Sequence, residues 1–369
     1  MILQEMSLCA FRNYDRATLE FAPGVNLIVG DNAQGKTNLL EAIAYLGSGK
    51  SFRASKTGEM VKFGAEFGEI SGKVFSQERQ QTLRFVLFSA GRPRQMWRNG
   101  VKMRSAGDIA GVLPTVLFCP EDLMVLKAGS AQRRRMGDQV LCQLRPNYDA
   151  ALTEYNRILD QKSRILRDRY ENPALLDILP EYNTRLCQVG ALLISYRARF
   201  YQSLGAEAAR FHSQFSGGAE DFTLEYKTVS TVDEPFASIG ILTENLQEHL
   251  QKHYRAELET CQCLTGPHKD DFTVCLSGVD LKAYGSQGQT RTAAISLKLA
   301  QRELMSREWG EEPVLLLDDV LSELDPGRQD FVLNQIISGQ VFITCCEPGR
   351  FTRLGKTMQI QHGSLVCSQ

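Results

Sequence analysis

The sequence predicts an α/β fold in which the two ends of the chain build one domain and a mostly helical arm is inserted between them. Three observations predict it. A glycine-rich loop at residues 30–37 lies between an apolar, strand-like segment and a helix-like segment. An apolar stripe with helical spacing runs through residues 179–200. Near the other end of the chain, the wholly apolar run 314–317 leads into Asp318 and Asp319, as in a parallel strand buried on both faces.

Composition narrows the class of protein. The 369 residues carry a formal net charge of −1, so a nucleic-acid site has to be a local patch or a groove between subunits. Residues 1–14 lack the pattern of a signal peptide, and no apolar stretch approaches the roughly 20 residues of a membrane span. The ten cysteines include no C-x-x-C pair. We therefore expect reduced thiols in a cytoplasmic protein that has no membrane partner.

The first elements are expected to be a short strand pair and a third strand within residues 2–29, then the loop, then a helix over residues 37–45. The loop has the pattern G-x-x-x-x-G-K-T, which is typical of phosphate binding. Its glycines let backbone N–H groups turn toward a phosphate, Lys36 places a positive charge on the β- and γ-phosphates, and the Thr37 hydroxyl is placed to ligate Mg²⁺. The predicted ATP-binding residues are Gly30, Asp31, Asn32, Ala33, Gln34, Gly35, Lys36, Thr37 and Asn38.

Basic residues gather in two later segments. Residues 60–104 alternate apolar and polar side chains, which predicts antiparallel strands, and positive charge there is interleaved with Trp97. That combination is compatible with nucleic acid, although a solvated basic hairpin explains it at least as well. The second segment opens the helical region that follows residue 121. The predicted DNA contacts are Arg53, Arg92, Arg94, Arg98, Arg133, Arg134 and Arg135.

The middle of the chain is expected to be helical. The apolar stripe in residues 179–200 advances by alternating steps of three and four, as in a coiled coil, and residues 152–165 form an earlier stripe. Asn172-Pro173 and Pro180 mark a break between them, so two long helices should form a hairpin. The predicted domains are 1–120 and 259–369, the two halves of a nucleotide-binding head, and 121–258, the arm.

The last third of the chain carries further chemistry. Asp318 is predicted to hold Mg²⁺ together with Thr37, and Asp319 to orient or deprotonate the attacking water. One of these carboxylates could instead cap the turn that follows them. Before a helix expected over 291–304 lies a second anion-binding nest, formed by Ser286, Gln287, Gly288 and Gln289.

The second nest has a consequence for assembly. One nucleotide already has its phosphate loop, so we expect this nest to reach the γ-phosphate of a nucleotide held by another subunit. ATP would then join two copies head to head. The segment after the apolar strand would line the same seam; it consists of Ser322, Glu323, Leu324 and Asp325.

The order of these motifs resembles that of ABC-type ATPases of the SMC and Rad-like branch. Finer matches are similar to the RecF family: 11–14 (FRNY), 30–38, 51–53 (SFR), 120–123 (PEDL), 266–271 (GPHKDD), 284–289 (YGSQGQ) and 317–319 (LDD). The resemblance implies an ABC-type head and a weak, DNA-stimulated ATPase. It also implies a protein that dimerises on ATP, binds duplex DNA beside single-stranded gaps, and helps to load recombinase with RecO- and RecR-like partners. The resemblance further implies a role in gap repair, in replication-fork maintenance and in the SOS response.

This chain departs from the wider ABC pattern in several places. Asp319 stands where most ABC ATPases have glutamate, which predicts slow hydrolysis. Thr344 stands near the usual histidine switch and is expected to contact the γ-phosphate region only weakly. Lys269 replaces a commoner arginine, and the segment before Pro120 is only a positional candidate for the Q-loop. Two other functions stay open, the ATPase subunit of a transporter and a P-loop kinase.

Overall fold

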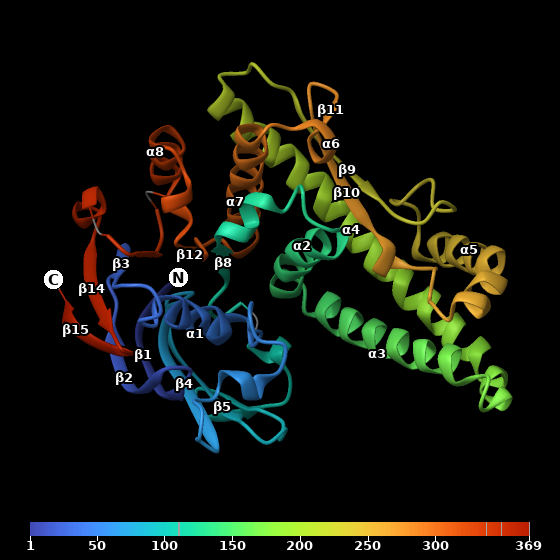
Figure 1. Cartoon of the computed structure of the whole chain (residues 1–369), viewed down its shortest axis with the longest axis horizontal. Coiled ribbons are helices and arrows are strands. Elements are labelled where there is room, and N and C mark those ends of the chain that lie inside the picture. Colours follow the sequence, from blue (N-terminus) through green and yellow to red (C-terminus); the bar gives the residue numbers. More distant parts are fainter. Residues whose placement is uncertain (110, 337, 348, 369) are drawn as a thin grey trace. The chain divides into compact units, whose positions relative to one another are not determined.

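The computed structural model describes residues 1–109, 111–336, 338–347 and 349–368 (Figure 1). The chain divides into two compact units. The first combines Met1–Leu123 with Lys298–Gln369, and the second is Met124–Leu297. The first unit is therefore built from both chain ends, as the sequence predicts. The second unit reaches beyond the predicted boundary at residue 258 and includes the segment up to Leu297.

A mostly parallel sheet forms one layer of the first unit. Its strand order is β15-β14-β3-β13-β12-β8, so strands from the two ends of the chain alternate. All pairs are parallel except β14 with β15, and every residue of β12 and β13 is buried. The strands are β3 (Val25–Val29), β8 (Thr115–Phe118), β12 (Val314–Asp318), β13 (Val341–Cys345), β14 (Lys356–Gln361) and β15 (Ser364–Ser368).

An antiparallel sheet forms the other layer, with the order β2-β1-β4-β5-β6-β7. Helix α1 (Lys36–Ser48) shares one apolar core with both sheets, in which Leu39 and Ile43 pack with Phe85 and Phe342. This confirms the antiparallel strands predicted for residues 60–104. The strands are β1 (Ile2–Phe11), β2 (Tyr14–Glu20), β4 (Phe67–Ser76), β5 (Arg79–Phe88), β6 (Gln95–Arg98) and β7 (Val101–Met103), and α8 (Pro326–Gln335) also belongs to this unit.

The second unit is mostly helical. Helices α3 (Pro146–Asp168) and α4 (Leu179–Ser216) form the predicted hairpin, and the apolar stripe of α4 is its seam: Leu186, Val189 and Leu193 are buried. Pro180 lies in the first turn of α4, where its missing N–H costs nothing. The unit also holds α2 (Ser130–Leu144), α5 (Ile239–Thr260), α6 (Leu281–Tyr284), β9 (Phe222–Lys227), β10 (Asp271–Leu276) and β11 (Val279–Asp280).

Strand pairing explains why the second unit continues past residue 258. β10 pairs antiparallel with β9 along its whole length, and β9 packs against α4. The residues after α5 are thereby held to the helical unit. Helix α7 (Gln287–Trp309) starts in this unit and ends in the first. Within the described residues, no helix is long and apolar enough to cross a membrane.

Candidate nucleotide site

The glycine-rich loop connects β3 to α1, and its two fixed glycines are required by its geometry. A Cβ on Gly30 would lie 2.3 Å from the carbonyl oxygen of Ile360. Gly35 has a φ of 118°, and a Cβ there would lie 2.8 Å from the side-chain amide of Asn13. Gly35 is also the N-cap residue of α1, and having no side chain it leaves the first turn of the helix open to an anion.

Lys36 follows Gly35 at the start of α1 and is 5 % exposed. Its ammonium donates to the carbonyl oxygens of Gly30 (2.7 Å) and Asp31 (3.0 Å) and lies 3.3 Å from Cys346 Sγ. The positive charge is therefore held within the loop where phosphate oxygens would bind.

Thr37 and Asp318 are 281 positions apart in the chain and meet at the carboxyl end of the parallel sheet. The Thr37 hydroxyl donates to Asp318 Oδ1 at 2.9 Å, and the Thr344 hydroxyl donates to the same oxygen at 2.8 Å. Burial raises the pKa of Asp318, while the hydrogen bonds from Thr344 and Thr37 work in the opposite direction. The structure thus brings together the two residues that the sequence predicts to hold Mg²⁺.

Asp319 turns the chain away from β12. Its φ of 51° lies in the left-handed region, which is costly for a residue other than glycine and is found most often at functional sites. The Asp319 N–H donates to Thr344 Oγ1 at 2.9 Å. Among the described residues, its side chain makes no capping hydrogen bond to the turn that follows. Thr344 therefore contacts the carboxylate of Asp318 and the backbone N–H of Asp319.

Two turns from distant parts of the sequence hold the loop from outside. Where the chain turns from β1 into β2, Asn13 Nδ2 donates to the Gln34 carbonyl (2.9 Å) and the hydroxyl of Tyr14, the first residue of β2, donates to the Gly35 carbonyl (3.0 Å). At the β14–β15 turn, the His362 N–H donates to Gln34 Oε1 (2.7 Å) and the Gly363 N–H donates to the Gln34 carbonyl (2.9 Å). The FRNY motif marked the first turn in the sequence; no sequence signal marked the second.

A buried ion pair lies one helical turn beyond the loop. Glu41 is fully buried in α1 and accepts hydrogen bonds from Arg12 at 2.7 and 2.8 Å and from the Ser51 hydroxyl at 2.5 Å. Arg53 follows in the same segment and donates to Asn38 Oδ1 at 3.0 Å. Burial raises the pKa of Asp318, and the charge of Arg53 is one of the smaller influences that oppose this rise. Arg53, predicted as a DNA contact, therefore lies beside the nucleotide loop.

The two remaining motifs lie in different units. Ser286, Gln287, Gly288 and Gln289 begin α7 in the second unit; α7 starts earlier than the predicted residue 291 because Ser286 Oγ accepts from the Gln289 N–H at 3.2 Å. The segment after β12 lies in the first unit: Ser322 Oγ donates to the Asp319 carbonyl at 2.6 Å, and Asp325 caps α8 by accepting from the Arg328 N–H. Glu323 and Leu324 lie between them.

One predicted DNA contact is wrong. Arg133 is 1 % exposed, donates to both carboxylate oxygens of Asp271 at 2.6 and 2.7 Å, and also donates to the carbonyls of Leu126 and Ala128. A guanidinium with these partners cannot reach a phosphate. Arg134 is half-buried and donates to the Asp270 carbonyl at 2.6 Å, whereas Arg135 is exposed.

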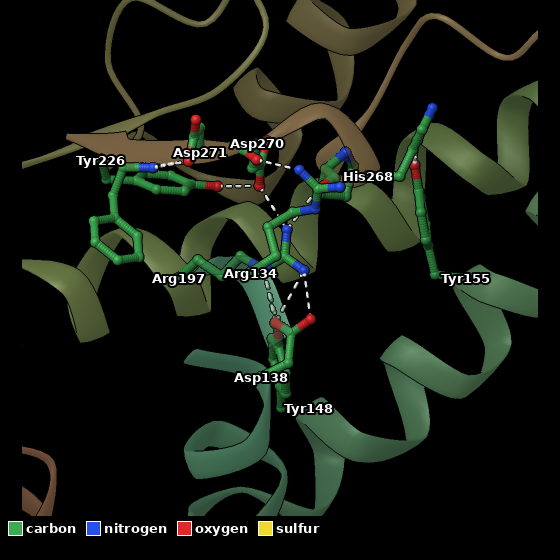
Figure 2. Close-up of polar contacts among 11 residues, drawn as sticks. Arg134, Asp138, Tyr148, Tyr155, Arg197, Tyr226, His268, Asp270 and Asp271 are labelled. Atoms are coloured by element: carbon green, nitrogen blue, oxygen red, sulfur yellow. Dashed lines mark hydrogen bonds and ion pairs between the residues drawn. The ribbon is translucent and has the colours of Figure 1, made fainter. Parts of the chain in front are cut away.

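The 266–271 segment (GPHKDD) is an anchor of the second unit (Figure 2). Arg197 of α4 donates to Asp270 Oδ2 at 2.8 Å, to the Pro267 carbonyl at 2.6 Å, and to Asp138 of α2 at 3.0 Å. Tyr226 of β9 also donates to Asp270, whose pKa is raised by burial. The motif therefore ties together α2, α4 and β9.

His268 in the same motif is set in one neutral tautomer. Its Nδ1 accepts from the Tyr155 hydroxyl (2.7 Å), and its Nε2–H donates to the Cys263 carbonyl (2.9 Å). Burial lowers its pKa from 6.5 to about 4. A histidine held in this way serves the packing of the unit rather than proton transfer.

Arg92 and Arg94, two of the other predicted DNA contacts, line a hollow of about 770 Å³ on the first unit. Arg94 reaches from it to the C-terminal end of α1, where it donates to the Tyr45 hydroxyl (3.0 Å) and the Gly49 carbonyl. Arg98 is held by Gln81 at 2.9 Å and is not part of the lining. The lining residues are Phe88, Arg92, Pro93, Arg94, Gln95, Lys102, Met103 and Arg104. Among these described lining residues, four carry a positive charge and none carries a carboxylate.

The chain is similar in sequence and in structure to several known proteins. The family model described as RecF/RecN/SMC N terminal domain matches residues 2–368. The DNA replication and repair protein RecF of Agathobacter rectalis is 38 % identical over 353 residues, which cover 96 % of this chain and 94 % of that protein. The structure of the recombination mediator protein RecF-ATP in the RecFOR pathway is 36 % identical, with a TM-score of 0.90, over 99 % of this chain and 96 % of that one. The Smc head domain from Pyrococcus furiosus, 15 % identical with a TM-score of 0.56 over 100 % of this chain and 96 % of that one, shares the fold.

Proposed function

Because the chain belongs to the RecF family of DNA replication and repair proteins, we propose that it is an ATP-dependent recombination mediator in which ATP closes a head-to-head dimer on DNA. The observation that carries this proposal is the meeting of Thr37, Asp318 and Thr344 beside an uncapped helix N-terminus. It supplies a phosphate cradle and oxygen ligands in one place. The proposed location of the protein is the cytoplasm.

The residues fit ATP with Mg²⁺. A hydroxyl and a carboxylate are ligands that Mg²⁺ prefers, and a bound cation would relieve the cost that burial places on ionised Asp318. Lys36 would exchange its loop carbonyls for the β- and γ-phosphates. Asp319 would orient or deprotonate the attacking water. Because its side chain is shorter than the glutamate of most ABC ATPases, hydrolysis would be slow and would serve to reset the dimer.

In the proposed dimer, each nucleotide is contacted by the first unit of one copy and by the second unit of the other. The phosphate loop belongs to the first unit and Ser286–Gln289 to the second. In the proposed dimer, the second nest of one copy binds the γ-phosphate of the nucleotide held by the other, and 322–325 line the same seam. The cradle of each copy would then be completed only when ATP is present.

DNA is the proposed partner of the dimer, as duplex beside a single-stranded gap. The hollow lined by Arg92, Lys102 and Arg104 would bind backbone phosphates, with Arg135 as a further exposed candidate. A similar protein works in the RecFOR pathway. RecO- and RecR-like mediators are therefore the proposed protein partners, in recombinase loading, fork maintenance and the SOS response.

The test is fluorescence anisotropy of a labelled gapped duplex titrated with protein, with and without ATP and Mg²⁺. ATP should strengthen binding, and Ser286→Arg, which places a bulky side chain at the second nest, should abolish that gain. The double variant Arg92→Glu/Arg104→Glu should weaken binding and lower the salt dependence by about one unit of slope for each lost phosphate contact. Arg79→Glu, an exposed arginine at the start of β5 and outside the hollow, is the control for each single charge reversal. Binding that is indifferent to ATP would contradict the proposal.

A further inference from the structure

Three side chains in the second unit link the signature segment Ser286–Gln289 to helix α4. Gln289 Nε2 donates to Glu220 Oε1 at 2.8 Å. The other carboxylate oxygen, Glu220 Oε2, accepts from His212 Nε2 at 2.8 Å. His212 lies in the last turns of α4, and Glu220 follows the glycine turn that ends this helix. None of these contacts belongs to the nucleotide loop or to the DNA-binding hollow.

Gln289 is part of the signature itself, because its side chain closes a capping box. Its Oε1 accepts from the Ser286 N–H at 3.1 Å, while Ser286 Oγ accepts from the Gln289 N–H at 3.2 Å. Accepting this bond leaves the hydroxyl hydrogen of Ser286 to donate elsewhere. The orientation of the Gln289 amide therefore decides how the start of α7 presents Ser286.

Glu220 fixes that orientation. With Oε1 directed at the Ser286 N–H, the amide nitrogen must face away, and the Glu220 carboxylate is the acceptor that it meets. The hydrogen bond from Gln289 is also the largest influence on the pKa of Glu220, which it lowers. The carboxylate is thus ionised, and a charged acceptor holds the amide more strongly than a neutral one.

His212 fixes Glu220 in turn. It is fully buried, and its Nδ1 has no hydrogen-bond partner within the described part of the chain. Because the Glu220 carboxylate only accepts, His212 Nε2 carries a hydrogen and donates it to Glu220. The ring also packs against Phe222 of β9, with centroids 5.5 Å apart. A buried ring with one polar contact is a rigid support for the carboxylate.

We propose that Glu220 is a positioning residue for the signature: it holds Gln289 in the capping box so that Ser286 is set to receive the γ-phosphate of a nucleotide bound by a second copy. This inference rests on the proposed ATP-closed dimer. Without the tether, only the bond from the Ser286 N–H orients the amide of Gln289, and the remaining disorder has to be removed each time two copies close. Because His212 belongs to α4, the same contact ties the signature to the helical hairpin.

The experiment measures the dimer dissociation constant by sedimentation velocity with a non-hydrolysable ATP analogue, and the affinity of dilute monomer for a fluorescent ATP analogue. Glu220→Ala should weaken the dimer about tenfold, the effect of losing one charge-assisted hydrogen bond. Monomer affinity should stay unchanged, because the phosphate loop belongs to the other unit. Glu220→Gln keeps one neutral acceptor for Gln289 and should recover part of the loss. Glu225→Ala, an exposed carboxylate on β9, is the matched control.

The Gln289→Ala background separates positioning from general damage. If Glu220 acts through Gln289, Glu220→Ala should have no further effect there. A loss that persists in that background would overturn the proposal, as would a Glu220→Ala dimer as stable as the wild type. Equal tightening by Glu220→Gln and Glu220→Ala would also overturn it, because the carboxylate would then only repel phosphate.

His212→Phe provides a second route that does not alter the signature. The ring keeps its packing against Phe222 but loses the donor to Glu220, so the dimer should weaken by a smaller factor in the same direction. An unchanged dimer would remove His212 from the proposal. A wild-type chain that stays monomeric with the ATP analogue would instead contradict the proposed function itself, which makes the two failures distinguishable.

Discussion

The two anion-binding segments of this chain are supported very differently. The phosphate loop is held by the turn after β1, by Cys346 beyond β13 and by the β14–β15 turn. The start of α7 closes on itself through its capping box, and the Gln289 side chain is tethered by Glu220. A loop held from three sides is a preformed cradle, whereas a segment tethered through the side chain of its last residue can respond to what binds it. We therefore expect nucleotide affinity to depend on the first region and dimer formation on both.

The largest effect should come from the charge in the cradle. Lys36→Ala removes the ammonium that lies over the loop and should weaken ATP binding by about 100-fold. Ser286→Arg should leave the ATP affinity of the monomer unchanged and remove only the dimer. Equilibrium titration with a fluorescent ATP analogue, together with sedimentation velocity, measures both quantities. Equal losses of nucleotide affinity in the two variants would show that the regions do not differ in this way.

The second unit should lose stability in acid because it contains the buried His268. His268 has a pKa of about 4 in the folded chain and 6.5 when unfolded, so between these values the unfolded state binds one more proton. The free energy of unfolding should therefore fall as the pH falls from 6.5 to 4, by about 3 kcal/mol in all. Above pH 6.5 this contribution is fully present.

Urea unfolding across this pH range tests the histidine. In His268→Gln the amide keeps hydrogen-bonding groups but does not titrate, so the variant should lack this part of the pH dependence. His253→Gln, in which a half-buried histidine of α5 is replaced, is the control and should keep it. A wild-type slope in His268→Gln would assign the acid sensitivity to other groups.

Asp319 should separate binding from turnover. Asp319→Asn keeps the size of the side chain and removes its basicity, so hydrolysis should slow by about 100-fold while ATP binding and the dimer persist. A phosphate-release assay and sedimentation with ATP measure the two effects. A variant that binds ATP but cannot dimerise would overturn the role given to Asp319. Asn is also less costly than Asp at the left-handed φ of 51°, so the fold should be retained.

The sequence predicted the features whose pattern is local. The loop could be found because its glycines and Lys36 stand at fixed spacing between a strand and a helix, and Asp318 because it ends an apolar run. Thr37 and Asp318 then had to be neighbours, since the carboxyl ends of parallel strands meet at one edge of the sheet. The helical hairpin could also be predicted, because the spacing of its apolar residues is a local pattern.

Features that depend on distant partners could not be predicted. Three consecutive arginines on a helix point in three directions, and only the fold reveals that Asp271 buries Arg133 and leaves Arg135 exposed. Glu41 has the sequence context of an exposed helical residue, yet Arg12 pairs with it in the core. The second unit also extends past the boundary expected at residue 258, because β10 pairs with β9.

The smallest predicted effect concerns the outer support of the cradle. Tyr14→Phe removes one hydrogen bond, from the hydroxyl to the Gly35 carbonyl, and leaves the buried ring in place. The loop then loses about 1 kcal/mol of restraint, so ATP affinity should fall by about fivefold. Tyr45→Phe also removes one hydroxyl contact, but at the far end of α1, and should leave ATP affinity unchanged. If both variants bind ATP like the wild type, the turn after β1 supports the fold rather than the loop, and the contrast between the two anion-binding segments is smaller than their contacts imply.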